Sequence, residues 1–363
     1  MAFIDDLFKS VAGQGFTDLL LLTGEVPLIR RGKTILKTEF GVVSATDAEQ
    51  VISEMMPESN VEEFRIKRDT HFAYACEGVG RFRCNVFMDS KGWCATFRLV
   101  PHEVTSFDKL GLPPAAKGLC YLRKGLVIVA GQAGSGRSTT LASLIDVVNS
   151  TRSVHVITLE DPVEFLHQNK QSFINQRSLR DHTATLASGV SAAMEEGPEV
   201  LMISDIDSPG AAAMAMEAAQ AGVLVFAAMK TPDALGTVKR LIDFYPPERE
   251  EQAREVVSAN LRGVLAQCIC RRTDGRQSVA AELLLVTQSV AKNIREGRID
   301  SIRETIAGYK SAGMQALNDS LAELVASEAI TAEEAYIKAV DKDDLISRLK
   351  TKGIRLDADG ILG

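Results

Sequence analysis

Residues 125–140 read GLVIVAGQAGSGRSTT, an apolar run followed by a glycine-rich loop. A short β-branched strand that leads into such a loop, with a helix behind it, is typical of the phosphate-binding P-loop, G-x-x-x-x-G-K-[ST]. Glycines let backbone N–H groups approach phosphate oxygens closely, and the dipole of the following helix favours anions. The stretch therefore predicts an α/β fold built around a nucleotide-binding loop.

One position of this loop departs from the pattern, because Arg137 stands where a lysine would contact the phosphates. Arginine is longer, planar and forked, so it stays attractive to phosphate yet can miss the oxygen on which charge develops in the transition state. The hydroxyl of Ser138 stands where the pattern holds Mg²⁺. We expect the nucleotide to be bound by Gly131, Gly134, Ser135, Gly136, Arg137, Ser138 and Thr139. The alternative is a glycine-rich turn that binds no ligand.

The strand pattern on either side of the loop indicates two domains. In residues 117–363, short apolar runs rich in β-branched residues alternate with helical segments, as in buried parallel strands. Residues 1–100 instead alternate helical stretches with strand-like runs bounded by glycine or polar turns, which predicts a smaller α+β domain. Residues 101–116 hold three of the prolines and show no period, so we expect a linker there.

Two amphipathic stretches are predicted to be helical. The first places five apolar residues on one helix face: Phe3, Ile4, Leu7, Phe8 and Val11. We expect this face to pack on its own domain rather than on a membrane or a partner, because amphipathic helices usually face a core. Residues 253–267 also show a helical period.

Charge and composition exclude several classes of protein. The formal net charge of −7 argues against a nucleic-acid-binding protein, because neutralising a phosphate backbone needs clustered Lys and Arg. The six cysteines include no C-x-x-C pair, so neither a zinc site nor a disulfide framework is indicated. No apolar run approaches the roughly 18 residues that span a bilayer. These features favour a protein of the reducing cytosol.

Four further segments, in this order and spacing, resemble the secretion ATPases, and most closely the PilT/PilU-type retraction ATPases of type IV pili. They read ITLEDPVEF at 157–165, GPEVLMISD at 197–205, AGVLVFAAMKT at 221–231 and LIDFYPP at 241–247. The resemblance implies a RecA-like P-loop domain with a smaller PAS-like α+β N-terminal domain. It also implies a cytoplasmic hexameric ring that binds ATP and Mg²⁺ between subunits, is peripheral at the inner face of the inner membrane, and contacts the platform protein of the pilus there.

The resemblance assigns roles to charged residues outside the loop. An acidic box at residues 160–164 would position Mg²⁺ and water, and arginines of the N-terminal domain would reach the nucleotide of a neighbouring subunit. We therefore expect the metal to be held by Ser138, Asp161 and Glu164. The implied catalytic residues are Glu160, Asp205, Lys230, Arg81, Arg83 and Arg98.

Catalytic positions of that family are replaced at several places besides Arg137. Asp205 stands where the family has the glutamate that polarises water, and it is one methylene shorter. A displacement of about 1 Å can lower the rate on the order of a hundredfold. Val223 and Lys230 stand where the family has two histidines; Lys230 can still donate to a γ-phosphate, whereas Val223 cannot.

These replacements favour an accessory protein of the retraction machinery. We predict that it binds ATP in a hexameric ring, with weak or no hydrolysis, as a homo-hexamer or in a mixed hexamer with a catalytically complete paralogue. The alternative is an active pilus retraction motor in which Arg137 and Asp205 are slow but working substitutes. A domain that only keeps the ring fold, without nucleotide, is a third possibility.

Overall fold

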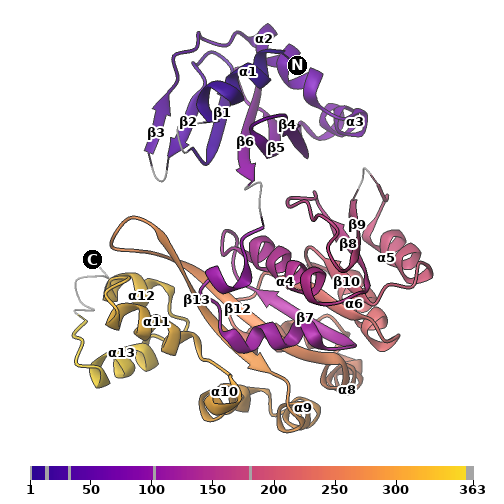
Figure 1. Ribbon diagram of the computed structural model, residues 1–363, viewed down its shortest axis with the longest axis vertical. Helices are drawn as coiled ribbons and strands as arrows, with labels where there is room; N and C mark the ends of the chain where they lie inside the picture. The colour runs from indigo at the N-terminus through magenta and orange to yellow at the C-terminus, as the bar shows by residue number, and fades with distance from the viewer. Residues whose placement is uncertain (1, 13–15, 32–33, 101–103, 180–181, 357–363) are drawn as a thin grey trace. The chain divides into compact units, whose positions relative to one another are not determined.

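The computed structural model describes residues 2–12, 16–31, 34–100, 104–179 and 182–356. Their backbone forms two compact units, each of which is described by itself (Figure 1). The first unit is built from the described residues before 104 together with residues 161–166 and the described part of 178–183; the second contains the rest. The sequence-based boundaries treat each domain as one continuous stretch, whereas these two later segments join the first unit because their backbone packs there.

The first unit contains one antiparallel sheet of six strands in the order β3-β2-β1-β6-β5-β4, with three helices. Its strands are β1 (Asp18–Leu22), β2 (Leu28–Arg31), β3 (Thr34–Lys37), β4 (Asp69–Cys76), β5 (Gly80–Met88) and β6 (Trp93–Val100). Its helices are α1 (Ala2–Val11), α2 (Ala45–Met55) and α3 (Glu58–Lys67). Buried and more accessible residues alternate along β5, as expected for a sheet with one face on a core.

Four of the five apolar residues predicted to pack on their own domain do so from α1, whereas Phe3 is 41% exposed. Ile4, Leu7, Phe8 and Val11 are all buried in the core of the first unit. The Phe8 ring stacks on Phe82 of β5 with centroids 3.8 Å apart.

The second unit contains a seven-stranded sheet in the order β13-β12-β7-β11-β10-β8-β9. Its strands are β7 (Gly125–Ala130), β8 (His155–Glu160), β9 (Phe173–Ser178), β10 (Val200–Ile203), β11 (Leu224–Met229), β12 (Leu261–Arg271) and β13 (Gln277–Leu285). Neighbouring strands from β12 through β8 run parallel, whereas β13 is antiparallel to β12. The predicted apolar runs thus form the buried centre of a parallel sheet.

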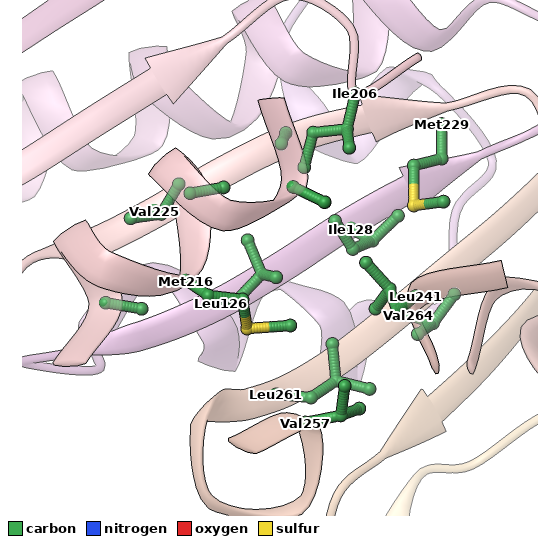
Figure 2. Packing of buried hydrophobic residues seen from close by; sticks show 14 of the residues in the cluster. Leu126, Ile128, Ile206, Met216, Val225, Met229, Leu241, Val257, Leu261 and Val264 are labelled. Carbon is green, nitrogen blue, oxygen red and sulfur yellow. The ribbon is translucent and has the colours of Figure 1, made fainter. Parts of the chain in front are cut away.

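Helices cover both faces of this sheet, and others follow at its end. They are α4 (Arg137–Thr151), α5 (Leu186–Glu195), α6 (Pro209–Gln220), α7 (Ala234–Asp243), α8 (Glu250–Asn260), α9 (Gln288–Arg295), α10 (Ile302–Gly308), α11 (Leu317–Ala326), α12 (Ala332–Lys338) and α13 (Lys342–Thr351). Leu126 and Ile128 of β7 pack toward α6, α7 and α8 (Figure 2). Val127 and Val129 belong to the core on the opposite face, with α4. No helix within the described ranges combines the length and apolarity needed to cross a bilayer.

The helix predicted over residues 253–267 is wrong in its second half. Helix α8 ends at Asn260, and residues 261–271 form β12, which pairs with β7 on one side and β13 on the other. Tertiary pairing with two strands outweighs a weak local period.

The predicted linker is only partly a linker. Residues 101–103 lie outside the described residues, but Phe107, Leu112 and Ala116 are buried in the core of the second unit. Removal of these three apolar side chains from water stabilises the segment against the core, although prolines interrupt its backbone.

Gly125, at the start of β7, gives a test of close backbone approach. Its φ is +115°, and a Cβ there would lie 2.8 Å from the carbonyl oxygen of Asn260. We expect Gly125→Ala to lower the free energy of unfolding by about 1–3 kcal/mol more than Gly222→Ala. Gly222 is the matched control because its φ is +104° and nothing lies within 4 Å of an added Cβ. If urea unfolding showed the same loss of free energy of unfolding for both variants, the close contact at Gly125 would be contradicted, and backbone strain at positive φ would account for the entire loss.

Glu282 on β13 gives a test of pH dependence. Its pKa is raised to about 7, mainly by burial and also by the Asp233 carboxylate, although the N–H of Ala234, which donates to its carboxyl at 2.7 Å, lowers it. Because the folded pKa lies above the unfolded value, stability present at acidic pH is lost as pH rises through about 7. Gln keeps the acceptor oxygen without ionising, so we expect Glu282→Gln to be more stable than the unmodified protein at pH 8 by up to about 3 kcal/mol, with little difference at pH 5. Urea unfolding at both pH values measures this.

Glu304→Gln is the control, since Glu304 is exposed on α10. If Glu282→Gln shifted stability equally at both pH values, the assigned ionisation would be contradicted.

Candidate functional site: the P-loop and the Asp205 cluster

The P-loop connects the end of β7 to the first turn of α4. Gly131, Gly134 and Gly136 have φ values of +154°, +76° and +87°, which L side chains rarely adopt. Gly136 is the N-cap residue of α4, so the loop delivers the free N–H groups of the first helical turn to its own concave side. The geometry is that of an anion-binding loop.

The loop is held from β12 by a residue that sequence analysis did not single out. The Gln267 side chain donates from Nε2 to the Ser135 carbonyl at 2.7 Å and accepts at Oε1 from the Thr140 hydroxyl at 2.8 Å. The sequence does contain a signal for this role, a single amide side chain within an otherwise apolar run. The signal was missed because a helix, and not a strand, was predicted over this stretch.

Three predicted site residues meet at the carboxyl edge of the sheet, and we call them the Asp205 cluster: Arg137, Asp205 and Lys230. Each residue follows a different strand, since α4 begins after β7, Asp205 follows β10 and Lys230 follows β11. Because these strands are parallel neighbours, their carboxyl ends share one edge. The sequence-distant residues are therefore brought together by strand order.

The Asp205 cluster is an ion-pair network centred on one oxygen. Asp205 Oδ2 lies 2.8 Å from Lys230 Nζ and 4.0 Å from Arg137 Nη2. Arg137 also donates from Nη1 to the Gly131 carbonyl, so its side chain folds back onto its own loop. Burial lowers the pKa of Arg137, yet a guanidinium stays charged in proteins.

Three buried polar atoms at this site have no hydrogen-bond partner among the described residues. They are Ser135 Oγ, Arg137 Nε and Asp205 Oδ1. Buried polar groups are normally satisfied, so orphaned atoms that gather in one place point to a missing ligand. Ser135 Oγ and Arg137 Nε are donors, and a phosphate group supplies the matching acceptors.

The remaining loop residues are more accessible. Ser138 is exposed at the start of α4, and Thr139 is half-buried.

Val223 is buried in the core of the second unit, so this replaced histidine position contributes packing.

The acidic box divides between the two units. Glu160, the last residue of β8, belongs to the second unit and accepts from the Thr158 hydroxyl at 2.6 Å and from Gln176 at 3.1 Å. Asp161 and Glu164 belong to the first unit. The structure therefore does not gather the three acids around one point within either unit.

Asp161 and Glu164 have basic neighbours within the first unit. Asp161 Oδ1 lies 3.4 Å from His71 Nε2 on β4, and Glu164 Oε1 accepts from Arg83 Nη1 on β5 at 3.0 Å. The predicted metal residues thus belong to different units, Ser138 to the second and these two acids to the first. Over the described part of the chain, no group of three or more His, Cys, Asp or Glu side chains is placed to hold a metal.

The other predicted arginines also lie in the first unit. Arg81 on β5 is half-buried, and its Nε is buried without a hydrogen-bond partner in the described structure. Arg98 on β6 donates to the buried Asp18 at 2.8 Å, and Arg30 lies 3.4 Å from the other oxygen of the same carboxylate. Arg98 therefore stabilises the pairing of β1 with β6.

Comparison with known proteins agrees with the motif order. The sequence matches the family described as Type II/IV secretion system protein over residues 42–354. The type IV pilus retraction ATPase PilT of Pseudomonas aeruginosa is 32% identical over 336 residues, which cover 93% of this chain and 98% of PilT. The type IV pilus ATPase PilU of the same organism is 27% identical over 356 residues, which cover 98% of this chain and 93% of PilU.

A solved structure extends the likeness to the fold. The crystal structure of the pilus retraction motor PilT with bound ADP matches with a TM-score of 0.87 at 32% identity, covering 95% of this chain and 99% of that one. The match confirms the predicted fold class, a RecA-like P-loop domain with a smaller N-terminal domain. The chain therefore belongs to the type II/IV secretion system protein family, among its PilT-type pilus retraction ATPases.

Proposed function

We propose that this protein binds ATP in a hexameric ring and acts as an accessory subunit of type IV pilus retraction, with weak or no hydrolysis. The observation that carries the proposal is the Asp205 cluster beside an intact glycine framework. The glycines leave backbone N–H groups available to bind phosphate. In the Asp205 cluster, however, the charged side chains that hydrolysis would need are paired with one another.

Nucleotide binding is supported by the shape and the unsatisfied donors of the loop. The positive-φ glycines leave backbone N–H groups free to approach phosphate oxygens. A phosphate would also satisfy Ser135 Oγ and Arg137 Nε, which otherwise stay buried without acceptors. The PilT structure, of the same fold and family, contains ADP.

Weak hydrolysis is supported by what surrounds Asp205. A carboxylate that polarises water must present a free oxygen at the right distance; Lys230 engages Oδ2 at 2.8 Å, which leaves only the buried Oδ1 for this role. The side chain is also shorter than the glutamate implied by the family resemblance. Arg137 donates to the Gly131 carbonyl, a bond that must break before the guanidinium can follow charge onto a transferring phosphoryl group.

Mg²⁺ binding is proposed on the chemistry of the donors. Hydroxyl and carboxylate oxygens are the ligands that this ion prefers, and Ser138, Asp161 and Glu164 are the residues that would help to hold it. Bound with nucleotide, Mg²⁺ neutralises charge on the phosphates. The contact of Asp161 with His71 and the ion pair of Glu164 with Arg83 would have to loosen for the acids to take part.

The ring and its partners are proposed from the family. Pseudomonas aeruginosa carries both PilT and PilU, so two related ATPases occur in one organism. We propose that this chain forms a homo-hexamer or a mixed hexamer with a catalytically complete paralogue, on the cytoplasmic face of the inner membrane at the pilus platform protein. Arg81 and Arg83 are the proposed contacts to a neighbour's nucleotide, whereas the bond from Arg98 to Asp18 suits a structural role.

Nucleotide binding is tested by thermal unfolding. We expect ATP with Mg²⁺, at about 100 times its Kd, to stabilise the folded protein by about 2.7 kcal/mol and so to raise Tm by several degrees. Arg137→Ala should lose most of this shift, because it removes the half-buried cation of the loop. Arg123→Ala, which removes an exposed arginine before β7, should keep the shift. No shift in the unmodified protein would overturn nucleotide binding.

Hydrolysis is tested by reversal of two replacements. The unmodified protein should release phosphate at the background rate, and Arg137→Lys with Asp205→Glu should raise release by at least about tenfold, because both charged groups return to the positions that the reaction needs. Asp207→Glu is the matched control, since it adds the same methylene at an exposed position two residues away. Turnover well above background in the unmodified protein would favour the active motor instead.

A further inference from the structure

We propose that Gln267 on β12 is a positioning residue that orients the P-loop for phosphate binding. The inference rests on the proposed nucleotide binding and assigns a role to a residue outside the loop. It is carried by two hydrogen bonds, by close packing against two glycines, and by the geometry of the peptide bond.

The Gln267 side chain ties the loop and the helix to the sheet through one amide. It is 3% exposed, and it bonds the carbonyl of Ser135 in the loop and the hydroxyl of Thr140 in the first turn of α4. The two partners bracket Arg137. Only a side chain with both a donor and an acceptor on one rigid plane can make this pair of bonds.

Two glycines of the loop also lie close to Gln267. A Cβ at Gly131 would lie 2.2 Å from Ser135 Oγ and 2.6 Å from the backbone carbonyl oxygen of Gln267. A Cβ at Gly136 would lie 3.2 Å from Gln267 Nε2, so of these two glycines only Gly136 packs against the Gln267 side chain. A larger residue at either position would push the loop away from β12. The glycines therefore serve approach to the sheet as well as approach to a ligand.

The bond to Ser135 fixes the direction of a loop N–H group. A trans peptide is planar, and its C=O and N–H point in opposite directions. Because Nε2 of Gln267 holds the Ser135 carbonyl toward β12 at 2.7 Å, the N–H of Gly136 must face away from β12. We place the phosphate on that side, where the N–H of Gly136 would donate to it. Without Gln267 this peptide can rotate, and the donor is no longer pre-oriented.

The test compares nucleotide affinity with stability in the absence of nucleotide. We expect Gln267→Met to weaken binding of mant-ADP with Mg²⁺ by at least about tenfold, the effect of losing one pre-oriented charge-assisted hydrogen bond. Gln315→Met is the matched control, because Gln315 donates to the Ala281 carbonyl at 2.9 Å but does not touch the loop. The control should lose as much thermal stability without nucleotide, yet bind mant-ADP as the unmodified protein does.

Three further variants separate the two hydrogen bonds and provide a test if Gln267→Met does not fold. Gln267→Glu keeps the shape and the acceptor for Thr140 but removes the donor to Ser135 and adds a negative charge near the phosphate, so it should bind no more tightly than Gln267→Met. Thr140→Val removes only the second bond and should cost less, and Thr140→Ser should restore affinity. Unchanged affinity in Gln267→Met or Gln267→Glu would overturn this inference alone. Absence of mant-ADP binding in the unmodified protein would overturn the proposed function and, with it, the inference.

Discussion

The second unit depends on the parallel pairing of β7 between β11 and β12. That pairing fixes where the P-loop leaves the sheet, and strand order then sets which residues meet it. Lys230 arrives from β11 and Asp205 from β10, while Gln267 supports the loop from β12. A residue far away in sequence becomes a neighbour of the loop because carboxyl ends of parallel strands share one edge.

Much of this arrangement could be predicted from the sequence. The strand, the phosphate loop and the start of the helix could be predicted from the apolar run, the glycine spacing and Ser138. Each of these local structures requires particular residue types at short spacing in the sequence. Arg137, Asp205 and Lys230 were singled out as replaced positions, and they do meet. Their ion pairs could not be foreseen, because a distance of 2.8 Å between Asp205 and Lys230 depends on side-chain rotamers as well as on strand order.

Other features depend on tertiary contacts that leave weak local signals. The stretch from Ala253 has a helical period, yet its second half becomes β12 because β7 and β13 both need a partner. The role of Gln267 was missed because this residue lies in the part of the predicted helix that is a strand. Asp161 and Glu164 have the right chemistry for a metal, but nothing in the local sequence indicates that they would contact His71 and Arg83 instead.

Binding and turnover make different demands on the same loop. Binding needs donors and the right backbone conformation, which the glycines, Ser135 and Gln267 provide. Turnover also needs groups that follow charge as it develops, whereas Asp205, Lys230 and Arg137 are held to one another and to the loop. The most direct measurement is a single-turnover experiment with protein in excess over radiolabelled ATP and Mg²⁺. Intact ATP recovered from the protein after several minutes is the predicted result, and conversion of the bound ATP to ADP within about a second, as in ordinary ATPases, would contradict it.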